Sequence, residues 1–173
     1  MAYQSQYTDA MLSGMQSAYG QGFLSPGGAN ELRRMVDGIE VEGRDVLDVG
    51  CGVGGAGILL AGEYGATSVL GIDVEARTLE MGWAAVAAAG LSDRITLELV
   101  APDTIPLPDS SFDMMLAKDV FCHVADRTAI AAEVFRVLRP GGQHIVAMSH
   151  RLFPTKAIAA FRHFSPQERV DLV

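Results

Sequence analysis

The sequence predicts an α/β fold built on a doubly wound parallel β-sheet, with helices on both faces of the sheet. Short apolar runs typical of buried strands alternate along the chain with stretches of helical periodicity. A glycine-rich turn at 50–55 joins the first apolar run directly to a helix. We find about five strands of this kind before the chain ends.

Each element has a local signal. Thr8 or Asp9 can cap a first helix, whose apolar side chains Met11, Leu12, Met15 and Tyr19 fall on one face. A loop rich in glycine and proline at 20–28 separates this helix from a second one. We expect helices at 29–37, 56–63, 75–89 and 127–138, and strands at 45–49, 68–72, 95–100, 112–117 and 144–148. Pro140, Gly141 and Gly142 are expected to end the last helix.

Composition restricts the function. The net charge of −8 and the absence of a basic stripe argue against a nucleic acid partner and favour a small, neutral or cationic substrate. The two cysteines are far apart and are expected to be reduced, as in the cytoplasm. No signal peptide and no membrane span are visible, and no histidine has metal-ligand spacing, so we expect neither a membrane partner nor a metal.

The turn after the first strand is the main candidate site. Gly50, Gly52 and Gly54 allow positive φ angles and let a ligand approach the backbone. The helix that follows favours a negative or electron-rich group at its N-terminus. Dinucleotide dehydrogenases share this glycine pattern, and a tight turn that binds nothing is a further alternative. Asp73, at the end of the next strand, either accepts the hydroxyls of a ribose or caps the following helix.

Four segments in order resemble class I S-adenosylmethionine (SAM)-dependent methyltransferases: 48–54, Asp-Val-Gly-Cys-Gly-Val-Gly; 71–73, Gly-Ile-Asp; 111–115, Ser-Phe-Asp-Met-Met; and 138–142, Leu-Arg-Pro-Gly-Gly. The resemblance covers residues 44–148. It implies a Rossmann-like fold, SAM as cofactor and S-adenosylhomocysteine (SAH) as product. It also implies that the three glycines, Asp73 and the adjacent Val74 contact the cofactor. The 138–142 segment would be structural and would lead into the fifth strand.

The N-terminal segments 6–9, Gln-Tyr-Thr-Asp, and 19–28, Tyr-Gly-Gln-Gly-Phe-Leu-Ser-Pro-Gly-Gly, resemble phosphoethanolamine N-methyltransferases. That resemblance implies a catalytic dyad of Tyr7, from an N-terminal lid, and His123, after the fourth strand. It also places Ser25 at the methionine part of SAM. The alternatives without a catalytic role are a mobile terminal aromatic residue for Tyr7 and, for His123, a helix-start residue whose side chain is bonded to the backbone.

Two further positions depart from that family. Lys118 stands where the family has arginine, ahead of Asp119, and we expect both near the cofactor. Asp119 would bind the amine or the amino group of the cofactor, or simply cap a turn. Ala101 occupies the place of the aspartate that meets adenine, so Asp103 or the backbone alone would take that role.

The expected organisation is an N-terminal helix and lid at 1–28, a SAM-binding core at 29–150 and a C-terminal tail at 151–173. A complete sheet of this family has seven strands, so we expect a C-terminally truncated member, whose exposed sheet edge would favour an oligomer. The expected function is methyl transfer from SAM to a small-molecule acceptor, foremost an amine such as phosphoethanolamine. The alternatives are another small metabolite, such as a quinone or a sterol, and a SAM- or SAH-binding fragment without activity.

Overall fold

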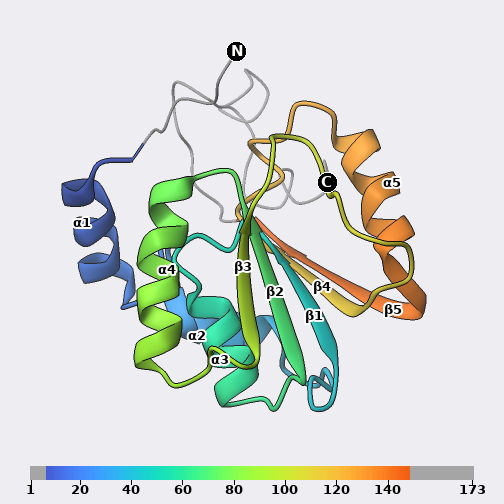
Figure 1. Cartoon of the computed structure of the whole chain (residues 1–173), viewed down its shortest axis with the longest axis horizontal. Helices are drawn as coiled ribbons and strands as arrows, with labels where there is room; N and C mark the ends of the chain where they lie inside the picture. Colours follow the sequence, from blue (N-terminus) through green and yellow to red (C-terminus); the bar gives the residue numbers. More distant parts are fainter. Residues whose placement is uncertain (1–6, 149–173) are drawn as a thin grey trace, which may run out of the picture.

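The computed structural model describes residues 7–148, which form one five-stranded sheet flanked by helices (Figure 1). The strand order is β3-β2-β1-β4-β5, and every neighbouring pair is parallel. The helices are α1 (Asp9–Tyr19), α2 (Gly28–Met35), α3 (Gly55–Gly62), α4 (Ala76–Ala88) and α5 (Arg127–Val137). The strands are β1 (Asp45–Val49), β2 (Ser68–Asp73), β3 (Ile95–Leu99), β4 (Phe112–Lys118) and β5 (Leu138–Ala147). The predicted fold class is confirmed, while the expected tail at 151–173 lies outside the described residues.

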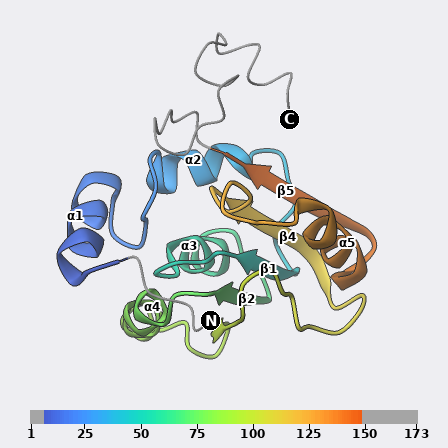
Figure 2. The same ribbon diagram turned by 90° about the horizontal axis from the view of Figure 1, so that it is seen from above.

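The central strands β2, β1 and β4 are largely buried on both faces, as their continuous apolar runs predict, whereas the edge strands β3 and β5 are more exposed. Side chains alternate between the two faces of a strand, so Met114 of β4 joins the core packed by α2, α3 and α4, whereas Met115 joins the core packed by α5. Figure 2 shows α3 and α4 on one side of the sheet and α5 on the other. None of the helices between residues 7 and 148 is long and apolar enough to cross a membrane.

The first helix begins as expected but packs less than expected. Thr8 caps α1, because its Oγ1 accepts a hydrogen bond from the Met11 amide at 3.3 Å. Leu12 is its buried residue, whereas Met11 is 45% exposed, so the predicted apolar face is wrong for Met11. Asp9, at the start of α1, forms an exposed ion pair with Arg77 of α4 at 2.8 Å, which links these two helices (Figure 1).

Strand β5 begins earlier than predicted. Helix α5 ends at Val137 and β5 starts at the next residue, so Pro140, Gly141 and Gly142 lie inside the strand and do not end the helix. The pairing between β4 and β5 shifts register here: Phe112 pairs with Leu138, and Met114 with Gln143. Such a bulge tolerates a proline without an N–H and a glycine with positive φ, which a regular ladder does not.

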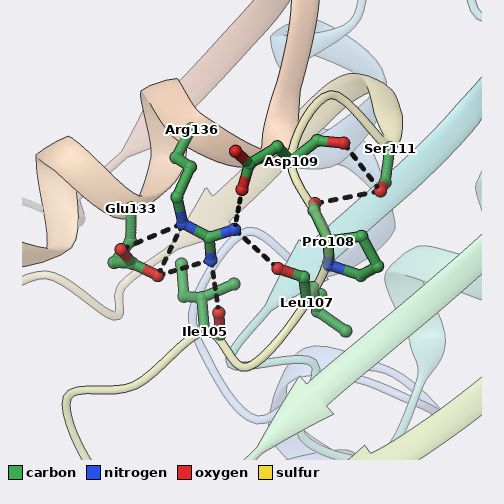
Figure 3. Close-up of polar contacts among 7 residues, drawn as sticks. All are labelled: Ile105, Leu107, Pro108, Asp109, Ser111, Glu133 and Arg136. Carbon is green, nitrogen blue, oxygen red and sulfur yellow. Dashed lines mark hydrogen bonds and ion pairs between the residues drawn. The ribbon is translucent and has the colours of Figure 1, made fainter.

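A single arginine fixes the segment that leads into β4. Arg136, in the last turn of α5, donates hydrogen bonds to the carbonyls of Ile105 at 2.9 Å and Leu107 at 2.7 Å (Figure 3). Its guanidinium also pairs with Glu133 and Asp109, each at 2.6 Å. The planar fork of arginine serves several acceptors at once, so one side chain connects the loop between β3 and β4 to α5.

Candidate functional site

The predicted site residues gather where three neighbouring strands end. Val49, Asp73 and Lys118 are the last residues of β1, β2 and β4. Because these strands are parallel and adjacent, their carboxyl ends lie at one edge of the sheet, where open α/β sheets bind ligands. The glycine turn leaves β1 at the same edge.

The glycine turn has the geometry that its sequence predicts. Gly50, Gly52 and Gly54 have φ angles of +70°, +55° and +78°. The Gly50 amide donates to the carbonyl of Ile72 at 2.8 Å, which holds the turn against β2. A Cβ at Gly50 would lie 2.2 Å from a methyl group of Val120, so only glycine fits there. Gly54 then forms the N-cap of α3.

Asp73 links the glycine turn to the second strand. Its Oδ2 accepts a hydrogen bond from the Gly52 amide at 2.8 Å, and its Oδ1 accepts one from the Glu75 amide at 3.0 Å. Glu75, and not Asp73, is the N-cap residue of α4. Burial raises the pKa of Asp73, although its backbone hydrogen bonds act in the opposite direction. A carboxylate has about four acceptor positions, so these bonds leave capacity for a ligand hydroxyl.

Asp48 is a site residue that the sequence analysis missed. It lies in β1, its side chain is 3% exposed, and its Oδ2 has no hydrogen-bond partner among residues 7–148. Burial, followed by the charge of Asp73, raises its pKa to about 7. Perturbed buried acids concentrate at functional sites. The available signal was a carboxylate placed inside an apolar strand, two residues before Gly50.

Three further predicted residues meet each other at this edge. The Lys118 ammonium lies 2.5 Å from Ser25 Oγ and 3.1 Å from Asp119 Oδ2. Asp119 has a φ of +59°, which is uncommon for a residue with a side chain. The sequence analysis placed all three near a cofactor, and the structure brings Ser25 into contact with Lys118, which lies 93 positions further along the chain.

The loop at 20–27, which we call the strap, lies over the start of α3. The Gly55 amide donates to the carbonyl of Gly22 at 3.1 Å, and the Gly22 amide donates to Gln16 Oε1 at 3.0 Å. The first amide of α3 is therefore bonded to the strap. A methyl group of Leu24 lies 3.3 Å from the position that a Cβ of Gly52 would occupy, so the strap also reaches the glycine turn.

The remaining predicted residues lie on the loops around this edge. Tyr7 directly precedes the cap of α1, and exposed His123 follows β4 in a turn where its amide donates to the Val120 carbonyl at 2.8 Å. Asp103, with a φ of +57°, accepts a hydrogen bond from the Ala125 amide at 3.2 Å and so joins the loop after β3 to the one after β4. Val74 follows Asp73, and its amide is one of the backbone donors that oppose the effect of burial, which raises the pKa of that carboxyl. The dyad of Tyr7 and His123 stays a prediction.

The chain is similar to methyltransferases in sequence and in structure. A model of the methyltransferase domain family matches residues 47–146. Phosphoethanolamine N-methyltransferase 1 of Arabidopsis thaliana is 32% identical over 168 residues, which cover 96% of this chain and 33% of that protein. A probable chloroplastic tocopherol O-methyltransferase of Oryza sativa is 34% identical over 110 residues, covering 64% of this chain and 30% of that protein.

A solved structure agrees with these relatives. Phosphoethanolamine N-methyltransferase 2 of Haemonchus contortus, in complex with S-adenosyl-L-methionine, matches with a TM-score of 0.80 and 25% identity. The match covers 98% of this chain and 41% of that chain. The chain thus spans about a third of the length of the curated relative from Arabidopsis thaliana.

Proposed function

The chain belongs to the class I SAM-dependent methyltransferases, and from that premise we propose that it transfers a methyl group from SAM to a small-molecule acceptor. The observation that carries this proposal is the hydrogen bond from the Gly52 amide to Asp73 Oδ2, at 2.8 Å. It joins the turn after β1 to the carboxylate after β2, at the edge where a ribose and its substituents are bound in doubly wound sheets.

The groups at this edge fit the chemistry of SAM. Asp73 retains acceptor capacity for ribose hydroxyls, and the unpartnered Oδ2 of buried Asp48 suits a nearby positive charge. SAM, when bound, supplies an electrophilic methyl group on a positively charged sulfur. In our proposal the backbone of the glycine turn and Val74 line the cofactor, while Ser25, Lys118 and Asp119 lie around its amino-acid end. Asp103 is assigned to the adenine end.

We propose an amine, such as phosphoethanolamine, as the acceptor. The names of the curated relatives support this choice, as does the structural match over nearly the whole chain. An amine attacks only in its neutral form, so a base with a pKa near 7 assists the transfer, and histidine is the usual group. His123 is assigned that role, and the hydroxyl of Tyr7 would orient the amine. Methyl transfer needs nucleophile and methyl group held together away from water.

A second acceptor class has its own support. The relative named as a probable tocopherol O-methyltransferase acts on an acceptor that is not an amine, and it is slightly more identical to this chain over a shorter stretch. A phenolic or other small metabolite is therefore the second candidate. Both candidates use the same cofactor edge.

Cofactor binding is tested first. SAM and SAH, each at about 100 times the dissociation constant, should stabilise the protein by about 2.7 kcal/mol and raise its melting temperature, whereas NAD should not. Asp73→Ala should abolish the ligand-dependent increment, while Asp93→Ala, in an exposed turn, should keep it. If neither SAM nor SAH raises the melting temperature of the wild-type protein, the proposal fails.

Methyl transfer is tested next with phosphoethanolamine, ethanolamine, glycine and a quinone precursor. Phosphoethanolamine should be the best acceptor, and His123→Ala and Tyr7→Phe should each reduce its turnover. Unchanged turnover in both variants would exclude the dyad. Binding of SAM without methylation of any acceptor would instead indicate a binding fragment.

A further inference from the structure

Besides its contacts with Gln16 and with the glycine turn, the strap has two polar or close backbone contacts with the elements below it. At its first half, the backbone of Gly22 lies directly on the backbone of Gly55, since a Cβ at Gly55 would be 2.2 Å from the Gly22 carbonyl oxygen. In Figures 1 and 2 the strap runs from α1 to α2. Its second half carries Ser25 and Pro26, which have a different contact.

That contact is with one partly buried cation. The side chain of Lys118, the last residue of β4, is 11% exposed. Its Nζ lies 2.5 Å from Ser25 Oγ and 2.9 Å from the Pro26 carbonyl in the strap. It also lies 2.8 Å from Glu31 Oε2 in α2 and 3.1 Å from Asp119 Oδ2. We call these five residues the Lys118 cluster.

The cluster occupies the donors of Lys118 with oxygens of this chain. An ammonium has three N–H donors, and oxygen atoms from four residues lie within reach of it. Hydrogen bonds to charged groups are stronger than those between neutral groups. Lys118 therefore contributes to the site by holding other residues, among them Ser25 and Asp119.

The backbone conformation of Asp119 depends on its contact with this cation. Its φ of +59° is sparsely populated for residues with a side chain, and such conformations persist only where the surroundings fix them. The Asp119 amide donates to the Ala147 carbonyl at 2.8 Å, and its carboxylate pairs with Lys118. The ion pair is thus one of the contacts that hold this residue.

We infer that Lys118 is a positioning residue, which holds the strap and Asp119 together at the carboxyl edge of the sheet and so preorganises the cofactor site. The second half of this statement rests on the proposed function. The first half concerns the chain without any ligand. A preorganised site binds more tightly because less ordering remains to be done on binding.

The test uses the variants Lys118→Met and Lys118→Arg. The control is Arg33→Met, which breaks an exposed ion pair between Arg33 and Glu63, the C-cap residue of α3. Hydrogen exchange of the peptide 20–27 is measured on the ligand-free chain, and SAH affinity is measured by calorimetry. Lys118→Met should speed exchange of this peptide about tenfold or more and weaken SAH binding by a similar factor, because each lost charged hydrogen bond is equivalent to about a tenfold change. Lys118→Arg should retain most of the wild-type protection of this peptide and most of the SAH affinity, and Arg33→Met should change neither quantity.

Unchanged exchange of the strap in Lys118→Met would overturn the inference, even if SAH binding were weakened, since Lys118 would then contact the ligand directly. If Lys118→Met does not fold, Glu31→Ala removes one partner of the cluster and should still speed exchange at 20–27; no change there would also overturn the inference. If the wild-type chain binds no SAH, the proposed function fails, while the exchange measurement decides the role of Lys118 on its own.

Discussion

Replacing Asp48 by asparagine tests how much an ionised carboxylate, buried in β1 beside the cofactor edge, destabilises the folded protein. Asp48 is 3% exposed within β1, and its Oδ2 has no partner among the described residues. Burial is the main cause of its raised pKa, and the nearby charge of Asp73 is the second. An ionised carboxylate in this position destabilises the folded state, because it is buried and its Oδ2 has no partner among residues 7–148.

The size of the effect follows from the pKa shift. The pKa rises from 3.8 to about 7 on folding, which is about three units and corresponds to about 4 kcal/mol at 1.36 kcal/mol per unit. The folded protein binds this proton more tightly than the unfolded chain does. The stability that the proton contributes is therefore complete below pH 3.8 and is lost as the pH rises towards about 7.

The asparagine of Asp48→Asn cannot ionise, so the variant does not lose this stability as the pH rises. The free energy of unfolding of the variant minus that of the wild type should rise by about 4 kcal/mol between about pH 4 and pH 8. The amide also lacks a partner at the Oδ2 position, which costs about 1–3 kcal/mol at every pH. The dependence on pH, and not the stability at one pH, is hence the quantity to compare.

Urea unfolding at several pH values between about 4 and 8 measures this difference, with Asp93→Asn as the exposed control. The control should follow the wild type throughout. Unfolding free energies of Asp48→Asn and wild type that run parallel across the whole range would show that Asp48 has an ordinary pKa, and the reasoning from burial would be refuted.

Three other substitutions have defined outcomes. Gly55→Ala places a Cβ 2.2 Å from the Gly22 carbonyl oxygen, so it should speed hydrogen exchange of the strap even though alanine favours a helix over glycine by about 1 kcal/mol; unchanged exchange would contradict the contact. Met115→Ala should lower the free energy of unfolding, measured in urea, by about 2–5 kcal/mol. Phe135→Ala, at a side chain that is 81% exposed, should change it by less than about 0.5 kcal/mol. Equal effects of the two substitutions would contradict the assignment of Met115 to the core. Arg136→Lys keeps the charge but loses the fork that reaches two loop carbonyls, so limited proteolysis should cut the loop at 105–109 faster than in the wild type.

The fold could be predicted because its signals are local. Strand β1, Asp45–Val49, is an apolar run that ends in a glycine turn, and the sequence predicts its bounds as the structure has them. The early start of β5 could not be predicted in the same way. Pro140 and Gly141 ordinarily end an element, and only the irregular pairing with β4, a contact between distant segments, accommodates them in a strand.

In the candidate site, too, the features set by neighbouring residues could be predicted, and those that depend on distant contacts could not. The positive φ angles of the glycine turn and the position of Asp73 at a strand end follow from neighbouring residues. The unpartnered oxygen of Asp48 does not, because burial is a property of the assembled sheet. The contact of Lys118 with Ser25 likewise joins positions far apart in the chain, which no local pattern encodes.

The contact between Gly22 and Gly55 has a consequence for how homologous sequences vary. Gly22 has a φ of +84° and is restricted by its own backbone, but Gly55 has no positive φ, and only the strap excludes a side chain there. Homologues that keep the strap in this place should therefore keep glycine at both positions. In homologues whose N-terminal segment runs elsewhere, nothing from this segment excludes a side chain at position 55, so alanine or serine should be accepted there. The residue at the start of α3 thus becomes a marker, readable in an alignment, of whether an N-terminal segment is docked.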